Sequence, residues 1–197
     1  MNPRPLLFFL RAISILIHLF QLVACATPAD YLYTIETSPG KLGHQLIKER
    51  PSVLVGPVIL PELIDHPQLV LRNGYYIIDV NERHRWATPL KESLPRVIAA
   101  ELSQLNTKQN YIAASPSVSP SAKARLLIEI TNFDISPTGA SIIAYWAYRP
   151  IDTHIKAIEG VSSVHAPTKS SNYIEYVDSA RRATIKLAND IADKLSK

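Results

Sequence analysis

The chain has 197 residues, of which 47% are apolar, and a formal net charge of +4. This length and composition suit one globular domain with a substantial core and exclude a disordered chain. The basic residues are scattered along the chain, and after residue 24 only 19 Lys and Arg stand against 17 Asp and Glu. We therefore predict no nucleic-acid binding, which usually requires a clustered basic face.

The N-terminal segment predicts a lipoprotein signal peptide. Arg4 and Arg11 flank apolar stretches, and the run at residues 12–24 has the length of a signal-peptide core. That run is shorter than the ~20 residues needed to cross a bilayer. It ends in the sequence LVAC, which fits the lipobox of bacterial lipoproteins, and Cys25 is the only cysteine in the chain. A plain membrane anchor, or an ordinary signal peptide with a chance cysteine, is the alternative interpretation.

The lipobox divides the chain into three parts. Residues 1–24 form the signal peptide, residues 25–30 a tether acylated at Cys25, and residues 31–197 a single folded domain. Several acyl chains on one cysteine give stable membrane attachment. Residue 26 is Ala rather than the Asp that retains enteric lipoproteins in the inner membrane, which favours the periplasmic face of the outer membrane.

The first half of the domain predicts four strands. Aromatic and β-branched residues favour a strand at 31–35, and the apolar run at 53–60 is typical of a strand buried on both faces. Gly56-Pro57 interrupts that run, so we expect a bulge or a sheet edge there. Residues 68–72 and 75–80 are expected to form a hairpin closed by a two-residue turn at Asn73-Gly74.

A helix is predicted to follow this hairpin. Thr88 is a suitable N-cap and Pro89 a suitable first helical residue, and apolar residues recur at helical spacing from Leu90 to Leu105. Pro95 lies within this stretch, so the helix is expected either to kink there or to begin its regular part there.

The second half predicts a meander and a long helix. A short strand at residues 111–114 is followed by three strands at 124–133, 140–148 and 155–165, which we expect to pair antiparallel. Residues 173–195 carry apolar side chains every three or four positions, as in an amphipathic helix. The predicted fold class is α+β, with two layers: a mostly antiparallel sheet with the first helix and the long C-terminal helix packed on it.

The sequence contains no catalytic or phosphate-binding motif. Its five histidines after residue 25 have no partner histidine at helical spacing, so no local metal pair is predicted. Asp65-His66 could form an acid–base pair, but flanking prolines at 61 and 67 indicate a rigid turn instead. We predict that the protein is not an enzyme and needs no cofactor or metal.

Three segments resemble one protein family. VGPVILP at residues 55–61, LIDHPQLV at 63–70 and RWATPL at 85–90 are similar to the ABC-type transport auxiliary lipoproteins of the PqiC (YmbA) group. The resemblance extends over nearly the whole domain, and the lipobox agrees with it. His66 stands where the family often has Arg, and Thr88 where it often has Glu, so the resemblance does not carry a role of those charges over to this chain.

The resemblance implies an accessory lipoprotein of an MCE-type intermembrane lipid transport system. Such a protein docks an MCE-domain protein and its inner-membrane components, and a homo-oligomer and direct lipid contact are left open. From the exposed loop, hairpin tip and neighbouring strand we expect the partner to contact the residues Leu63, Asp65, Asn73, Gly74 and Arg85. One alternative is a structural envelope lipoprotein that supports another complex or binds the cell wall, and another is a lipid-anchored hydrolase.

Overall fold

The structure is a computed structural model that describes residues 29–37, 50–115 and 121–196. The predicted lipidation site, Cys25, and the sorting residue, Ala26, lie outside these residues. All the helices and strands described below belong to one compact unit that begins at Tyr31.

The described residues form two sheets and two helices. The first sheet has the order β1-β4-β3, with β1 at Tyr31–Tyr33, β4 at Ile77–Trp86 and β3 at Gln68–Asn73. The second has the order β5-β2-β6-β7-β8, and its strands are β5 at Asn110–Ala113, β2 at Ser52–Ile59, β6 at Ala122–Ser136, β7 at Gly139–Pro150 and β8 at Ile158–Pro167. The helices are α2 at Leu90–Leu105 and α3 at Tyr173–Leu195.

The α+β class is confirmed, and the strands β6, β7 and β8 form the predicted antiparallel meander. The sheets are mixed, however, because β2 runs parallel to both β5 and β6 and β1 runs parallel to β4. The predicted bulge is present: the pairing of β2 with β6 shifts between Val55 and Val58, and the Gly56–Pro57 peptide bond is cis. The pairing of β2 with β5 ends at Val55, so Gly56-Pro57 also marks the point where β2 becomes an edge on that side.

Helix α3 has the predicted bounds. The side chain of Asn172 accepts a hydrogen bond from the Glu175 amide at 2.9 Å and caps the first turn, and Glu175 and Lys194 suit the helix dipole. The helix buries a stripe that includes Ala180, Leu187 and Ile191. Ile174, which the periodicity placed in this stripe, is instead exposed.

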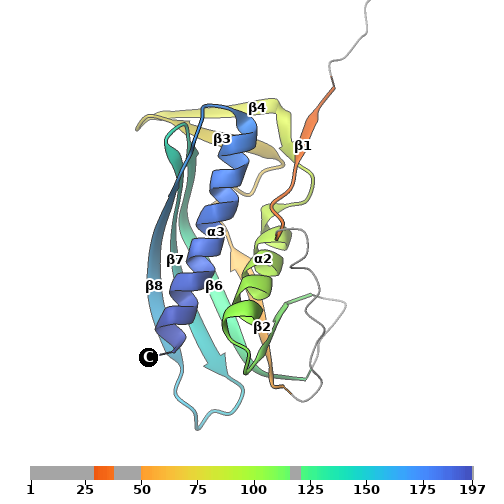
Figure 1. Cartoon of the computed structure of the whole chain (residues 1–197), viewed down its shortest axis with the longest axis vertical. Helices are drawn as coiled ribbons and strands as arrows, with labels where there is room; N and C mark the ends of the chain where they lie inside the picture. Colours follow the sequence, from red (N-terminus) through yellow and green to blue (C-terminus); the bar gives the residue numbers. More distant parts are fainter. Residues whose placement is uncertain (1–28, 38–49, 116–120, 197) are drawn as a thin grey trace, which may run out of the picture. The chain divides into compact units, whose positions relative to one another are not determined.

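Both helices cover the same face of the five-stranded sheet (Figure 1). Helix α3 packs on β7 and β8, helix α2 packs on β2 and β5, and the helices pack on each other. Alternate residues of the meander point into this core, and Trp146 donates a hydrogen bond from its indole Nε1 to the Ser162 hydroxyl at 2.9 Å. Among the described residues no helix lies on the opposite face of the sheet, which is called the helix-free face below.

The predicted two-residue turn at Asn73-Gly74 is wrong. Asn73 pairs with Ile77 across the ladder, so the connection has three residues, and only Gly74 of the described turn has a positive φ, +76°. Side-chain contacts near the turn and along the hairpin are compatible with this register. Arg72 reaches Asp134 of β6 at 2.6 Å, and Asn81 donates to the Tyr173 hydroxyl at 2.9 Å.

The start of α2 also differs from the prediction. Pro89, rather than Thr88, occupies the N-cap position, and no side chain caps the helix. The chain stays extended up to this point because the Ala87 amide donates to the Tyr33 carbonyl of β1. The helix then runs without interruption to Leu105, with Pro95 inside it.

Gly160 of β8 provides a test of the packing under α3. It lies opposite Trp146, and a Cβ atom at residue 160 would lie 2.4 Å from Cζ2 of the indole ring. Since the ring is buried and hydrogen-bonded to Ser162, it has little room to move. We expect Gly160→Ala to lower the free energy of unfolding by about 1–3 kcal/mol, measured by urea denaturation.

The matched control is Ser163→Ala, an exposed position in the same strand. It should change the free energy of unfolding by less than about 0.5 kcal/mol. Equal stabilities of the two variants would contradict the described packing of Trp146.

Candidate protein interface

The loop at residues 61–67 presents a fixed turn with one apolar side chain outward. The amides of Ile64 and Asp65 both donate to the Pro61 carbonyl, at 2.9 and 3.1 Å. Ile64 is 5% exposed and anchors the loop in the core, whereas Leu63 is 39% exposed. The predicted contact residue Leu63 is therefore held at the surface on a defined backbone.

Two further contacts hold this loop against neighbouring elements. The Asp65 carboxylate lies 3.4 Å from the Lys91 ammonium of α2, and the Trp86 amide donates to the Pro67 carbonyl at 2.8 Å. Asp65 is thus engaged with a lysine of the first helix, which gives no support to an acid–base pair with His66.

The structure separates the five predicted contact residues into two groups. Arg85 lies opposite Gln68 at the end of β3 that follows the loop, so Arg85 belongs with Leu63 and Asp65. Asn73 and Gly74 lie at the other end of β3, about 17 Å away for a strand of this length. One compact partner contact at the loop would therefore leave the hairpin tip free.

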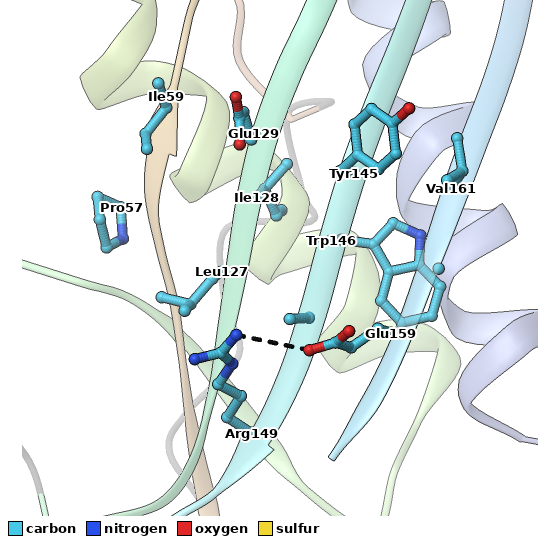
Figure 2. A pocket seen from close by; sticks show the side chains of 12 residues that line it. Pro57, Ile59, Leu127, Ile128, Glu129, Tyr145, Trp146, Arg149, Glu159 and Val161 are labelled. Carbon is cyan, nitrogen blue, oxygen red and sulfur yellow. Dashed lines mark hydrogen bonds and ion pairs between the residues drawn. The ribbon is translucent and has the colours of Figure 1, made fainter.

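A second candidate surface is a shallow groove of about 610 Å³ on the helix-free face of the five-stranded sheet. Strand register places Ile59, Glu129, Tyr145 and Val161 in one row across β2, β6, β7 and β8. Figure 2 shows this row at the upper end of the groove. The lining is mostly apolar and also includes Pro57 of β2 and Leu127 of β6.

Charged groups border the groove. Arg149 of β7 and Glu159 of β8 form an ion pair at 3.5 Å, drawn as a dashed line in Figure 2. Both side chains are more than half exposed, so this pair contributes little to stability and is available to a partner. The groove therefore offers apolar contact with a polar rim, the usual layout of a protein interface.

Sequence reasoning missed this groove, although β7 carries a signal for it. Residues 142–147 are apolar at every position but are not long enough to form a helix of their own. Such a run is typical of a strand covered on both faces. In the structure only one face is covered, since Ile142 and Ala144 are buried while Ile143 and Tyr145 are exposed.

An aromatic stack joins β1, β4 and α3. The ring of His84 in β4 lies between Tyr173 and Tyr31, with centroid distances of 3.5 Å and 4.9 Å and interplanar angles of 8° and 12°. The Tyr33 hydroxyl is hydrogen-bonded to His84 Nδ1 at 2.7 Å. The stack holds β1 and the start of α3 against β4.

The environment of His84 favours the neutral ring. Desolvation by the stacked rings lowers its pKa below the usual 6.5, and the charge of Arg83 lowers it further. A protonated His84 would have to be accommodated among aromatic rings beside a cation.

This pKa predicts a pH dependence of stability. Because the folded state binds the proton on His84 less readily than the unfolded chain, His84 lowers the free energy of unfolding as the pH falls below about 6.5. We expect His84→Phe, which keeps a stacking ring without the titrating group, to remove part of this loss. The measurement is urea denaturation of both proteins between pH 5 and 8, and an unchanged difference across this range would contradict the assignment.

The described residues were also compared with the requirements of a metal site and of a membrane-spanning helix. Within residues 29–37, 50–115 and 121–196, His, Cys, Asp and Glu do not gather into a group of three that could hold a metal ion. No helix among those same residues is long and apolar enough to span a membrane.

Solved structures share this fold. A crystal structure of an uncharacterized protein has a TM-score of 0.68 and 15% sequence identity, over 85% of this chain and 99% of its own. The crystal structure of protein XCC0632 from Xanthomonas campestris, of family DUF330, has a TM-score of 0.58 and 16% identity, over 82% of this chain and 92% of its own. At these identities the likeness concerns the fold alone.

The match to a family model is more specific than the likeness of fold. Comparison with curated proteins gave no match. The family model of the ABC-type transport auxiliary lipoprotein component matches residues 33–192, which include the loop, the hairpin, the groove, helix α2 and all but the last three residues of α3. The chain therefore belongs to the family of ABC-type transport auxiliary lipoprotein components.

Proposed function

We propose that the protein is an accessory component of an MCE-type intermembrane lipid transport system. It is anchored to the periplasmic face of the outer membrane through acylated Cys25 and acts by docking an MCE-domain protein. The observation that carries this proposal is an apolar, helix-free sheet face on a domain that belongs to a transport auxiliary family.

The groove is a better docking surface than the loop at residues 61–67. Among the loop residues, all of which the structure describes, Leu63 is the one exposed large apolar side chain. The loop backbone is hydrogen-bonded within the turn and to Trp86. The groove offers Tyr145 and Val161 side by side and Ile59 on the other side of Glu129, so a partner that covers it buries several apolar side chains.

The chemistry of the groove also defines the partner segment. An apolar side chain can pack on Tyr145 and Val161, and a charged group of either sign finds a counterpart in Glu129 or in the Arg149–Glu159 pair. We expect a segment of the MCE-domain protein with an apolar face and charged edges to bind here. Leu63, Asp65 and Arg85 then serve as a secondary contact or do not take part.

Substituting one groove residue tests this interface. Ile59→Lys replaces an apolar side chain of the row with a charged one and spares the helix-covered core, because Ile59 is 57% exposed. We expect this variant to bind the periplasmic part of the MCE-domain partner at least about tenfold more weakly than wild type, since the lysine must be desolvated on binding. Binding is measured by surface plasmon resonance with the purified proteins.

Two matched variants make the test specific. Leu105→Lys adds the same charge at a 50% exposed apolar residue at the end of α2, away from the groove, and should bind as wild type does. Leu63→Lys tests the loop. Weak binding by the Leu63 variant with normal binding by the Ile59 variant would assign the contact to the loop, and a wild type that binds no MCE-domain protein would contradict the proposed function.

The lipid anchor has its own test. Cys25→Ser removes the only thiol of the chain, so the protein should lack acyl chains by mass spectrometry and leave the membrane fraction. Wild type should carry the acyl mass on a chain that begins at Cys25 and should sediment with outer-membrane markers. An uncleaved wild-type chain would show that the apolar segment is a plain anchor.

A further inference from the structure

Two tyrosines at the tip of the β3–β4 hairpin are almost fully exposed. Tyr75 is 90% exposed and Tyr76 is 96% exposed, and Ile77 beside them is also exposed. Residues 73–78 read NGYYII and carry no charge. Large exposed aromatic side chains in an uncharged segment are rare on a soluble surface and mark a contact with a partner or a membrane.

Other exposed apolar residues lie on the neighbouring elements. Tyr31 and Leu32 of β1 and Ile174 of α3 are exposed, and the aromatic stack on His84 holds both elements against β4. In Figure 1 the tip of the β3–β4 hairpin lies at the upper left of this unit and β1 at its upper right, with the start of α3 between them. These residues are therefore a second exposed apolar group, separated from the tip by the length of β4.

The length of the predicted tether limits how far Tyr31 lies from the membrane. Tyr31 is the first residue of β1 and lies opposite His84 of β4. Cys25 lies six residues before Tyr31, a reach of at most about 20 Å. A cysteine acylated there keeps the start of β1 within about that distance of the membrane.

The hairpin has a comparable reach. Ile77 lies seven residues along β4 from His84, the partner of Tyr31, which is about 23 Å of strand. The tip is also braced, because Arg72 pairs with Asp134 and donates from Nη1 to the Tyr75 carbonyl at 3.4 Å. A braced backbone lowers the cost of ordering the turn when its two rings bind.

We propose that the hairpin tip, through Tyr75, Tyr76 and Ile77, inserts into the interface of the membrane that carries acylated Cys25. Tyrosine has an apolar ring and a polar hydroxyl, which suits the headgroup level of a bilayer. One lipid anchor holds a domain near the membrane without fixing its orientation. A second contact at the tip orients the domain, so the opposite end and the groove face away toward the periplasm. This inference rests on the proposed acylation of Cys25.

A fluorescent label at the tip tests the proposal on the acylated full-length protein. Acylated Cys25 has no free thiol, so Tyr76→Cys gives a single site for the environment-sensitive dye NBD. The labelled protein is reconstituted into vesicles of phosphatidylethanolamine and phosphatidylglycerol. We expect the emission to shift to shorter wavelength and to be quenched when brominated phospholipids replace the ordinary ones.

Tyr145→Cys is the matched control, since it labels an exposed tyrosine on the helix-free sheet face. Its dye should show neither the shift nor the quenching. Equal quenching of both dyes, or of neither, would overturn the proposal. A shift at residue 76 without quenching, lost when the protein is diluted in the bilayer, would show that a second copy covers the tip and would also overturn it. The vesicles contain no MCE-domain protein, so the result is independent of the docking function.

Discussion

The packing of α3 against one face of the β6–β7–β8 meander is the contact on which the rest of the structure depends. Small residues on the helix, including Ala180, Ala183 and Ala188, let it lie close to the sheet, where Trp146 is buried and hydrogen-bonded to Ser162. The same contact exposes the other face. Since β7 is apolar at consecutive positions, covering one face with helices leaves Ile143 and Tyr145 for a partner.

The elements with strong local signals could be predicted from the sequence. Helix α3 was predicted with its bounds because apolar residues recur every three or four positions over residues 173–195, and in the structure Asn172 caps its first turn. The meander followed from alternation and turn residues. Strand order could not be predicted in this way, because the parallel pairing of β2 with β5 and β6 joins segments far apart in the chain. Local preference also gave the wrong turn at Asn73-Gly74, where the Arg72–Asp134 and Asn81–Tyr173 contacts fit the longer loop.

The candidate sites also divide into features with a local sequence signal and features set by the pairing of distant strands. The loop with Leu63 and Asp65 was recognised from its prolines, but its distance from Gly74 depends on the length and direction of β3, which no motif encodes. The row from Ile59 to Val161 is a product of register across four strands. Its one local signal, the two-sided apolar pattern of β7, is indistinguishable in the sequence from that of an ordinary buried strand.

Docking of an MCE-domain protein on the helix-free sheet face is the central claim, and photo-crosslinking in living cells tests it most directly. The crosslinker p-benzoylphenylalanine replaces Tyr145, whose ring lies in the groove between Glu129 and Val161, and a second protein carries it at Leu105 on the opposite side. The account predicts a crosslink from residue 145 to an MCE-domain protein and none from residue 105. A crosslink from residue 145 only to other envelope proteins, or none at all, would contradict it.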